Sequence, residues 1–471
     1  MKLPKNKKKI TFSIIILIVI ITVFIGSAIG TGNFLSVKKA IPGPLKDLLK
    51  KTIFVIPELN KTNKRILKYA NEINKDLIEL RSMASLNGSM SSNINITSSK
   101  NENENYNLKK YVLNGNLIEN ETSILSLNKQ PAGYVSHKDS LVIIITGKGS
   151  VFFIDKSEIL NKKNNLNFRS IPNNIENYFK HDEEFYSFYH IGVRDTLIDD
   201  DYIYLSYNKL QSEDCYNISI LRSKINDKFL DFENFFTYDE CIETNKVEKF
   251  YINQSGGRIV KYLDNSILFS TGSMRAYYND ENAKKIVEQD ENSKFGKILL
   301  INIKSKKSEI FSLGHRNPQG LTFLKKNNIV LSTEHGAIGG DEINLIKKGK
   351  NYGWPIASYS LGHYDGTYKV NAPLLKPHSK YGFEEPLKYW TPAIGISQLE
   401  KNINKENSIL IASMRNETIH DIEFDQNYEK IIGENEIFIG QRIRDISSDK
   451  ELNLYYLILE NPSRLAILQK N

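Results

Sequence analysis

The chain has 471 residues, of which 40% are hydrophobic and 25% are charged, a balance typical of globular proteins rather than disordered ones. The formal net charge is +8 at pH 7, but much of it sits in basic clusters near the N-terminus and the remainder is close to balanced. This distribution argues against a nucleic acid as the main partner, because such partners favour a basic face on the folded domain.

The N-terminal segment has the pattern of a membrane anchor. Residues 1–9 form a basic head, and residues 10–30 form an apolar run without a charged side chain. About 20 apolar residues suffice to cross the hydrocarbon core, and the basic flank stays in the cytoplasm. We therefore predict an uncleaved transmembrane helix with the rest of the chain on the periplasmic or extracytoplasmic side. A cleaved signal peptide is the alternative, although the apolar run is long and its cleavage site poor.

Residues 31–107 are predicted to form a juxtamembrane helix and a linker. A basic amphipathic stretch at 45–56 between prolines suits the membrane surface. Apolar residues recur at helical spacing over 63–83. Residues 84–107 are rich in Ser and Asn with little apolar content, which is typical of a flexible linker.

The segment 108–471 has the pattern of an all-β domain. Short runs of β-branched and aromatic residues, such as 141–146, 202–207, 298–303 and 454–459, recur between Gly, Asn and Asp. Roughly 360 residues at about 60 per four-stranded unit predict a six-bladed β-propeller. A pair of β-sandwiches is the structural alternative.

The chain contains two cysteines, Cys215 and Cys241. Outside the membrane they could form a disulfide, and their polar sequence surroundings favour this over two unpaired thiols. Two cysteines at this separation are too few for a zinc cluster.

The run from Gly314 to Trp354 has an unusual composition. It combines turn glycines, an Arg-Asn pair, two histidines, adjacent carboxylates and a terminal aromatic residue. A core strand needs none of these, so the run is predicted to build a site.

Four motifs within this run, at 314–320, 334–336, 340–346 and 351–355, resemble in order and spacing the signature of the glucose/sorbosone dehydrogenase family. Further blocks extend the resemblance over most of residues 185–450. The resemblance implies a six-bladed propeller that binds pyrroloquinoline quinone (PQQ) and calcium and oxidises the anomeric hydroxyl of aldose sugars. It leaves the electron acceptor open.

The resemblance also implies a set of cofactor ligands. PQQ is a flat tricarboxylate, and the arginine fork suits both its carboxylates and its ring plane. Arg442 and Arg444 match the family's cofactor-binding pair and would share one face of a strand. Arg415 stands where the family usually has a lysine. Arg316 and Asn317 match the pair that contacts the reactive edge of the cofactor.

Two calcium sites are implied in the same way. The backbone carbonyls of Gly336 and Ala337 would hold the calcium that polarises PQQ. Glu342 and the carbonyl of Tyr352 would form a second, structural site. Calcium prefers such hard oxygen ligands.

The match fails at the general base. The family places a histidine four residues before the arginine of its Gly-Arg pair, with an aspartate before it. Counting back from Arg258 gives Gln254 at the base and Asn253 at the acid. An amide cannot accept a proton near neutral pH, so catalysis worth about 10²–10⁴-fold should be lost at Gln254.

Three further residues match positions that line the family's substrate pocket, namely His190, His335 and Asp341. Either histidine could act as a substitute base when neutral, and a structural role is the alternative for each.

Two main hypotheses follow. One is a membrane-anchored, PQQ- and calcium-dependent aldose dehydrogenase with its usual base replaced. The other is a catalytically inactive propeller that binds sugar, PQQ, or a protein or cell-wall ligand. The loss of the base histidine motivates the second hypothesis.

Overall fold

The computed structural model describes residues 92–97, 105–112, 133–161, 166–178, 192–247, 250–274, 286–363, 372–460 and 463–471. All of them belong to one compact unit, Ser85–Asn471. The basic head, the predicted anchor at 10–30 and the predicted juxtamembrane helix lie outside the described residues. Within the ranges that the structure describes, no helix combines the length and the apolarity needed to cross a bilayer.

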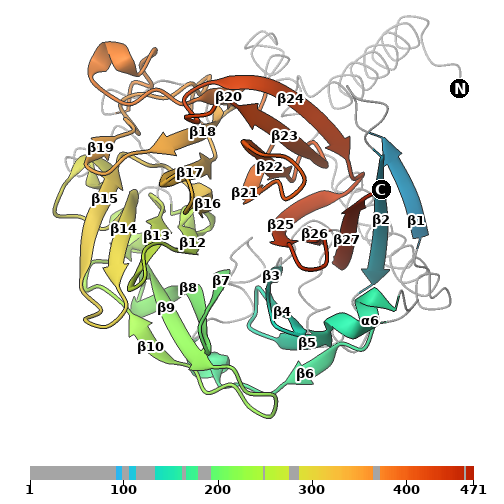
Figure 1. Ribbon diagram of the computed structural model, residues 1–471. Coiled ribbons are helices and arrows are strands. Elements are labelled where there is room, and N and C mark those ends of the chain that lie inside the picture. Colours follow the sequence, from blue (N-terminus) through green and yellow to red (C-terminus); the bar gives the residue numbers. More distant parts are fainter. Residues whose placement is uncertain are drawn as a thin grey trace, which may run out of the picture. The chain divides into compact units, whose positions relative to one another are not determined.

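The described residues form six sheets around a central axis (Figure 1), and their strands pair antiparallel except for β15 with β19. This arrangement confirms the predicted all-β, six-bladed propeller and excludes a pair of sandwiches. The inner strand of each sheet faces the axis and contacts the inner strands of both neighbouring sheets. In chain order, the inner strands are β3 (Gly133–Lys138), β7 (Val193–Asp199), β12 (Gly256–Lys261), β16 (Pro318–Leu324), β21 (Ile396–Lys401) and β25 (Arg442–Asp449).

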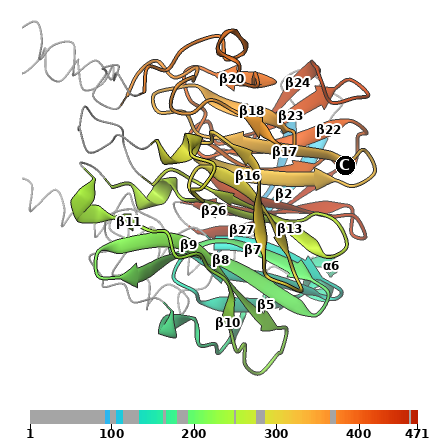
Figure 2. The same ribbon diagram turned by 90° about the vertical axis from the view of Figure 1, so that its left-hand side faces the viewer.

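The outer strands complete each blade, and the blades stack beside one another in the side view (Figure 2). Blade 1 continues with β4 (Leu141–Thr146), β5 (Val151–Asp155) and β6 (Arg169–Ile171). Blade 2 continues with β8 (Tyr202–Ser212), β9 (Cys215–Lys224) and β10 (Glu233–Phe236), with β11 (Ile242–Glu243) beside β9. Blade 3 continues with β13 (Ser266–Thr271), β14 (Lys297–Asn302), β15 (Ser308–Leu313) and β19 (Lys350–Asn351). Blade 4 continues with β17 (Ile329–Glu334), β18 (Asp341–Ile346) and β20 (Lys388–Trp390), and blade 5 with β22 (Ser408–Ser413), β23 (Thr418–Phe424) and β24 (Ile431–Phe438).

Blade 6 is built from both sides of the sequence. The strands β26 (Leu454–Glu460) and β27 (Arg464–Lys470) follow β25, and β2 (Asn105–Val112) then pairs with β27. The edge strand β1 (Ser92–Thr97) pairs with β2. The strand β1 and the start of β2 lie in the stretch 84–107, so the prediction of a flexible linker is wrong there. An edge strand is held by backbone hydrogen bonds, so a polar sequence does not exclude it.

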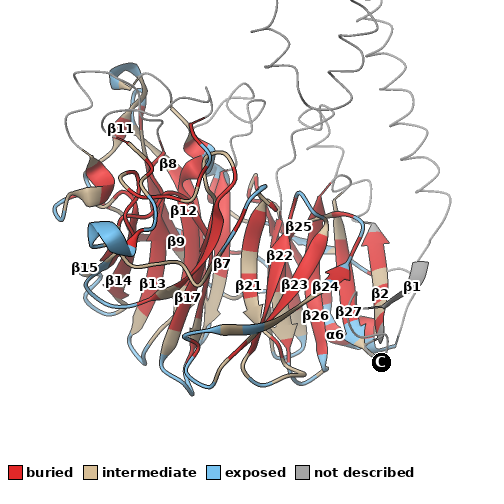
Figure 3. Cartoon of the chain, turned by 90° about the horizontal axis from the view of Figure 1, so that it is seen from above, coloured by how far each residue is buried: buried red, intermediate tan, exposed pale blue. Residues whose placement is uncertain are grey.

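The hydrophobic core is divided among the six seams between neighbouring blades. Each of the six main clusters of buried side chains draws on two adjacent sheets. A middle strand therefore meets apolar neighbours on both faces, and the run Leu-Val-Ile-Ile-Ile-Thr of β4 is buried along nearly its whole length. Figure 3 shows buried residues filling the strands, with exposed residues in the connecting turns.

The cysteines form a disulfide, as their surroundings favoured. Cys215 begins β9 and Cys241 directly precedes β11, with 5.5 Å between their Cα atoms. The bond fastens β11 to the edge of blade 2. The described part of the chain contains one α-helix, α6 (Lys156–Leu160), at the end of β5.

Candidate functional site

The predicted site residues gather at one end of the propeller, where the inner strands begin. Arg442 and Arg444 open β25, and Arg316 and Asn317 directly precede β16. Gln254 ends a 3-10 turn just before β12. In an antiparallel blade, the loop between the second and third strands lies at this same end. That geometry places the connections 335–340 and 414–417 on the same face.

A single buried carboxylate holds the predicted arginine pair. Glu460, at the end of β26, accepts a hydrogen bond from Arg444 Nε at 2.8 Å and from Arg442 Nε at 3.1 Å. The Arg444 side chain is buried, whereas that of Arg442 is 36% exposed. Burial opposes the charged form of Arg444, but Glu460 outweighs this and raises the pKa of the guanidinium. Glu460 therefore fixes the position of both guanidinium groups.

Arg415 directly follows a residue that contacts this pair in space. It is exposed in the turn between β22 and β23 and follows Met414. The carbonyl of Met414 lies 3.4 Å from Arg442 Nη1. The turn thus brings a third cationic residue to the same end of blades 5 and 6.

The Arg316–Asn317 pair is held from several sides. The Arg316 guanidinium lies over the Trp354 ring at 5.2 Å and donates through Nη1 to the His335 carbonyl at 3.0 Å. Asn317 Oδ1 accepts from the backbone N–H of Gly256 at 3.2 Å. Both side chains are largely buried. These contacts join the start of β16 to the loop at 335 and to the loop that carries Gln254.

Gln254 occupies the family's base position inside this framework. The side chain is buried, and Ser273 Oγ donates to its Oε1 at a long 3.5 Å. The backbone of this loop passes close to β13, because a Cβ on Gly272 would lie 1.9 Å from the Gln254 carbonyl oxygen. The carbonyl of Asn253 receives Arg194 Nη2 at 3.3 Å and Gln319 Nε2 at 3.4 Å.

A small cavity opens between blades 3 and 4. The space in it that is open to water-sized particles is about 10 Å³, room for about one water molecule or ion. Its lining includes Arg316, Glu334, His335, Glu342 and Tyr352. The predicted structural calcium ligands therefore face a common space.

Two carboxylates, Glu334 and Glu342, stand opposite each other in this cavity as cross-strand neighbours. Burial opposes ionisation of Glu334, but His315 and the backbone N–H of Arg316 outweigh it and lower the pKa of that carboxyl. Burial, and then the charge of Glu334, hold the pKa of Glu342 well above its ordinary value. Asn344 donates to Glu334 Oε1 at 3.0 Å. A divalent cation would offset the repulsion between the two carboxylates.

The loop that should supply the other calcium ligands is fixed by its own N–H groups. Gly336 N–H donates to Asp341 Oδ1 at 3.2 Å, and Ala337 N–H donates to Ser360 Oγ at 2.8 Å. In a trans peptide the carbonyl points opposite to the N–H. The Gly336 carbonyl therefore points away from Ser360.

Asp341, which the resemblance places among the residues of the substrate pocket, is fully buried at the start of β18. It has no exposed surface, and its Oδ2 accepts from the backbone N–H groups of Gly395 (2.8 Å) and Ile396 (3.1 Å). Burial opposes its ionisation, but His335 and the backbone N–H groups of Ile396 and Gly336 lower its pKa. The carboxylate ties the loop 335–340 to the start of β21.

His335 lines the cavity between blades 3 and 4, whereas His190 lies outside the described residues. The His335 side chain is 18% exposed, lines the cavity, and has its Nδ1 3.7 Å from Asp341 Oδ1. This distance is too long for a hydrogen bond, so the interaction is electrostatic.

Sequence reasoning missed three buried carboxylates of the site, those of Glu460, Asp195 and Asp445. Glu460 closes an apolar strand, and its contact with two arginines depends on strand pairing. At the axis, Arg258 Nη1 lies 2.8 Å from Asp195 Oδ1 and 2.7 Å from Asp445 Oδ1. This ion triad joins blades 2, 3 and 6 directly beneath the loop of Gln254.

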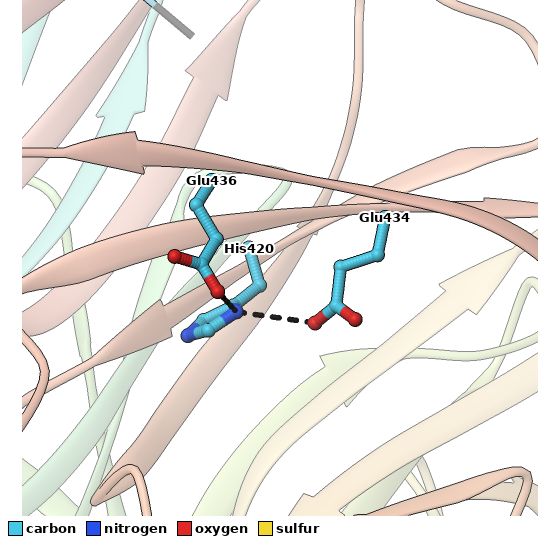
Figure 4. Close-up of side chains that lie close together, drawn as sticks. All are labelled: His420, Glu434 and Glu436. Atoms are coloured by element: carbon cyan, nitrogen blue, oxygen red, sulfur yellow. Dashed lines mark hydrogen bonds and ion pairs between the residues drawn. The ribbon is translucent and has the colours of Figure 1, made fainter. Parts of the chain in front are cut away.

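A separate acidic cluster lies on the outer strands of blade 5 (Figure 4). His420 Nδ1 lies 3.3 Å from Glu434 Oε1 and 3.8 Å from Glu436 Oε1. Lys388 Nζ lies 2.7 Å from Glu434 Oε2. The hydrogen bond with His420, followed by Lys388, lowers the pKa of Glu434 to about 2. The cluster therefore behaves as an ion-pair network that joins β20 of blade 4 to blade 5.

Known proteins resemble this chain in sequence. The model of the family described as "Glucose / Sorbosone dehydrogenase" matches residues 187–467. The chain is 27% identical to the aldose sugar dehydrogenase YliI of Escherichia coli over 302 residues, covering 58% of this chain and 76% of that protein. It is 37% identical to a protein of Synechocystis sp. over 166 residues, covering 34% of this chain but only 39% of that protein.

Solved structures share the fold. The PQQ-bound form of the aldose sugar dehydrogenase from Streptomyces coelicolor superposes with a TM-score of 0.53 at 17% identity, covering 77% of this chain and 98% of that one. At that identity the likeness concerns the fold alone. The family model, in contrast, spans more than half of the chain and includes the arginines, the carboxylates and the loop described above. The chain therefore belongs to the glucose/sorbosone dehydrogenase family.

Proposed function

We propose that this protein is a PQQ- and calcium-dependent oxidoreductase that oxidises the anomeric hydroxyl of aldose sugars. Family membership and the relatives named as aldose sugar dehydrogenases support the proposal. The observation that carries it is the cationic end of the propeller. There, Arg442 and Arg444 of blade 6 share Glu460, and the Arg316–Asn317 pair directly precedes the inner strand of blade 4.

The residues present fit a flat tricarboxylate. Arg442 and Arg444 would bind carboxylates of PQQ through their terminal nitrogens. Arg415 would add a third cation from the neighbouring turn. Arg316 and Asn317 would face the reactive edge of the cofactor, and Trp354 keeps the Arg316 plane in place. When bound, PQQ supplies a quinone that accepts the hydride of the sugar.

The donor set also fits calcium, which prefers carboxylate and carbonyl oxygens. Glu342 and the Tyr352 carbonyl would hold the structural ion in the cavity between blades 3 and 4. Glu334 lies opposite and would contribute its charge. The carbonyls of Gly336 and Ala337 would hold the ion beside PQQ.

The proton of the sugar hydroxyl has no acceptor at the usual place. Gln254 can donate or accept a hydrogen bond there, so it can orient a hydroxyl but cannot take its proton. His335 lines the cavity, and its carbonyl accepts a hydrogen bond from Arg316 of the pair that would face the cofactor. We propose His335 as the substitute base, and His190 remains a second candidate for substrate contact.

The proposal extends to the location of the protein. The apolar run 10–30 would anchor the chain in the membrane, with the propeller on the periplasmic or extracytoplasmic side. This side is compatible with the Cys215–Cys241 disulfide. Electrons would then pass from the reduced cofactor to an acceptor that the sequence does not identify.

A reconstitution experiment tests the function. The protein is loaded with calcium, titrated with PQQ while absorbance is followed, and then offered a panel of aldoses with an artificial electron acceptor. We expect saturable PQQ binding and sugar-dependent reduction of the acceptor. Absence of PQQ binding would contradict the proposal at its base.

A second candidate function is a binding propeller without chemistry. The amide at Gln254 favours it, because the arginines and carboxylates are kept while the base is absent. This candidate predicts PQQ or sugar binding by calorimetry together with no turnover on any aldose.

A further inference from the structure

The carboxylate of Glu460 stands between two cofactor-binding arginines. Its side chain is 3% exposed, and each oxygen serves one arginine, with Oε1 accepting from Arg444 Nε and Oε2 from Arg442 Nε. Glu460 lies on β26, whereas both arginines lie on the neighbouring strand β25. Glu460 belongs to none of the motifs that mark the family in this sequence.

The choice of nitrogen matters for what the arginines can still bind. A carboxylate on Nε leaves the terminal nitrogens of a guanidinium available to another acceptor. Arg442 uses these nitrogens only in long contacts, 3.4 Å to the Met414 carbonyl and 3.6 Å to its sulfur. Ordinary N–H···O bonds are about 2.7–3.2 Å, so a ligand carboxylate could replace these contacts.

The charge balance points the same way. Two guanidinium groups and one carboxylate leave one net positive charge in a largely buried place. The remaining positive charge attracts an anion, while the single carboxylate reduces the repulsion between the two guanidinium groups. A second carboxylate at this place would cancel the attraction for an anion. Loss of Glu460 would leave two adjacent cations without a counter-charge.

Arg444 also connects Glu460 to the loop that carries Gln254. Its Nη1 donates to Gln319 Oε1 at 3.1 Å, and Gln319 Nε2 lies 3.4 Å from the Asn253 carbonyl. The chain of contacts therefore runs from blade 6 through the start of blade 4 to the residue before Gln254. A shift of Arg444 would displace both the cofactor site and this loop.

We propose that Glu460 is a positioning residue for the quinone cofactor. It sets the terminal nitrogens of Arg442 and Arg444 so that they meet a carboxylate of PQQ, and it does not itself contact the cofactor. This inference rests on the proposed PQQ function and adds a residue that the family resemblance did not assign.

The test is PQQ titration of the full-length, calcium-loaded protein, followed by absorbance at several salt concentrations. In Glu460→Gln the amide oxygen can accept from one Nε–H, but the NH₂ group faces the other donor. We expect Kd for PQQ to rise about tenfold or more and the absorbance spectrum of bound PQQ to change. Glu460→Asp keeps the charge on a shorter stem and should recover part of the affinity.

The matched control is Glu436→Gln, which removes the charge of a 54% exposed glutamate on blade 5 and should leave Kd unchanged. Near-UV circular dichroism establishes that each variant is folded. If Glu460→Gln does not fold, the Glu460→Asp titration carries the test, with a several-fold rise in Kd expected.

The outcomes separate this inference from the proposed function. Wild-type binding with unaltered Kd and spectrum in both Glu460 variants would overturn the positioning role and leave the PQQ function standing. Failure of the wild-type protein to bind PQQ would overturn both. A raised Kd with a changed spectrum in the variants, against an unchanged control, supports the inference.

Discussion

At the residue scale, the base position sets this chain apart from the family pattern, because Gln254 and Asn253 stand where the resemblance implies a histidine and an aspartate. Gln254 is buried in a loop that Asn317, Ser273 and the Asn253 carbonyl contacts hold in place. These contacts fix the loop that carries the base position. The position is suited to a direct test of whether the family's base can be restored.

We expect Gln254→His to raise the rate of aldose oxidation by up to about 10²–10⁴-fold, because an imidazole can accept the proton that an amide cannot. The measurement is kcat of the protein loaded with PQQ and calcium, with its pH profile. The gain should follow deprotonation of the new histidine as pH rises. Gln254→Asn is the matched control and should show no gain. An unchanged kcat in the histidine variant would mean that the base acts elsewhere.

The Lys388–Glu434–His420 cluster predicts a pH dependence of stability. The pKa of Glu434 is lowered from 4.5 to about 2 in the folded protein. A lowered pKa stabilises the fold above the unfolded value, and this contribution is lost as pH falls from about 4.5 towards 2. Glu434→Gln should therefore destabilise the protein at pH 7, by at most about 3 kcal/mol, and flatten its stability over that acidic window.

Thermal unfolding between pH 2 and 7 measures this effect. Glu436→Gln is the control, because its side chain is 54% exposed and lies 3.8 Å from His420 Nδ1, and it should change stability less. Equal acid sensitivity of the wild type and Glu434→Gln would show that the ion pair contributes nothing.

At the scale of elements, blade 6 is closed by a strand from the N-terminal side of the domain, β2. The strand β2 pairs with β27 over the register from Tyr106↔Lys470 to Val112↔Arg464. Its Leu108 side chain is fully buried among residues of blades 5 and 6. The ring of blades thus closes through a strand that comes from the N-terminal side of the domain.

We expect Leu108→Ala to reduce the free energy of unfolding by about 2–5 kcal/mol, because it leaves a cavity in the seam that closes the ring. Leu263→Ala is the matched control, since that leucine is 50% exposed in a turn, and it should cost about 0.5 kcal/mol or less. Chemical denaturation of both variants measures the difference. Similar midpoints for the two variants would show that β2 is not needed for closure.

At the scale of the whole molecule, sequence reasoning found the periodic and the local features. Runs such as the one in β4 predicted the blades, and the motifs from Gly314 to Trp354 predicted the family. It missed β1, because an edge strand is held by its backbone and leaves no apolar pattern. It also missed Glu460 and the Arg258 triad, because these contacts join residues far apart in the sequence.

The buried carboxylates between blades 3 and 4 predict that calcium stabilises the whole fold. Burial and Glu334 raise the pKa of Glu342, so without a cation the stability of the fold falls as pH rises above the ordinary value near 4.5. Calcium bound to the folded state alone would stabilise it by about 2.7 kcal/mol at 100 times its Kd.

We therefore expect calcium to raise Tm by several degrees at pH 7 and a chelator to reverse the change. Glu342→Gln should be at least as stable as the wild type in chelator, since the buried charge is gone, and should show no calcium-dependent rise. An equal rise in both proteins would place the stabilising ion away from Glu342.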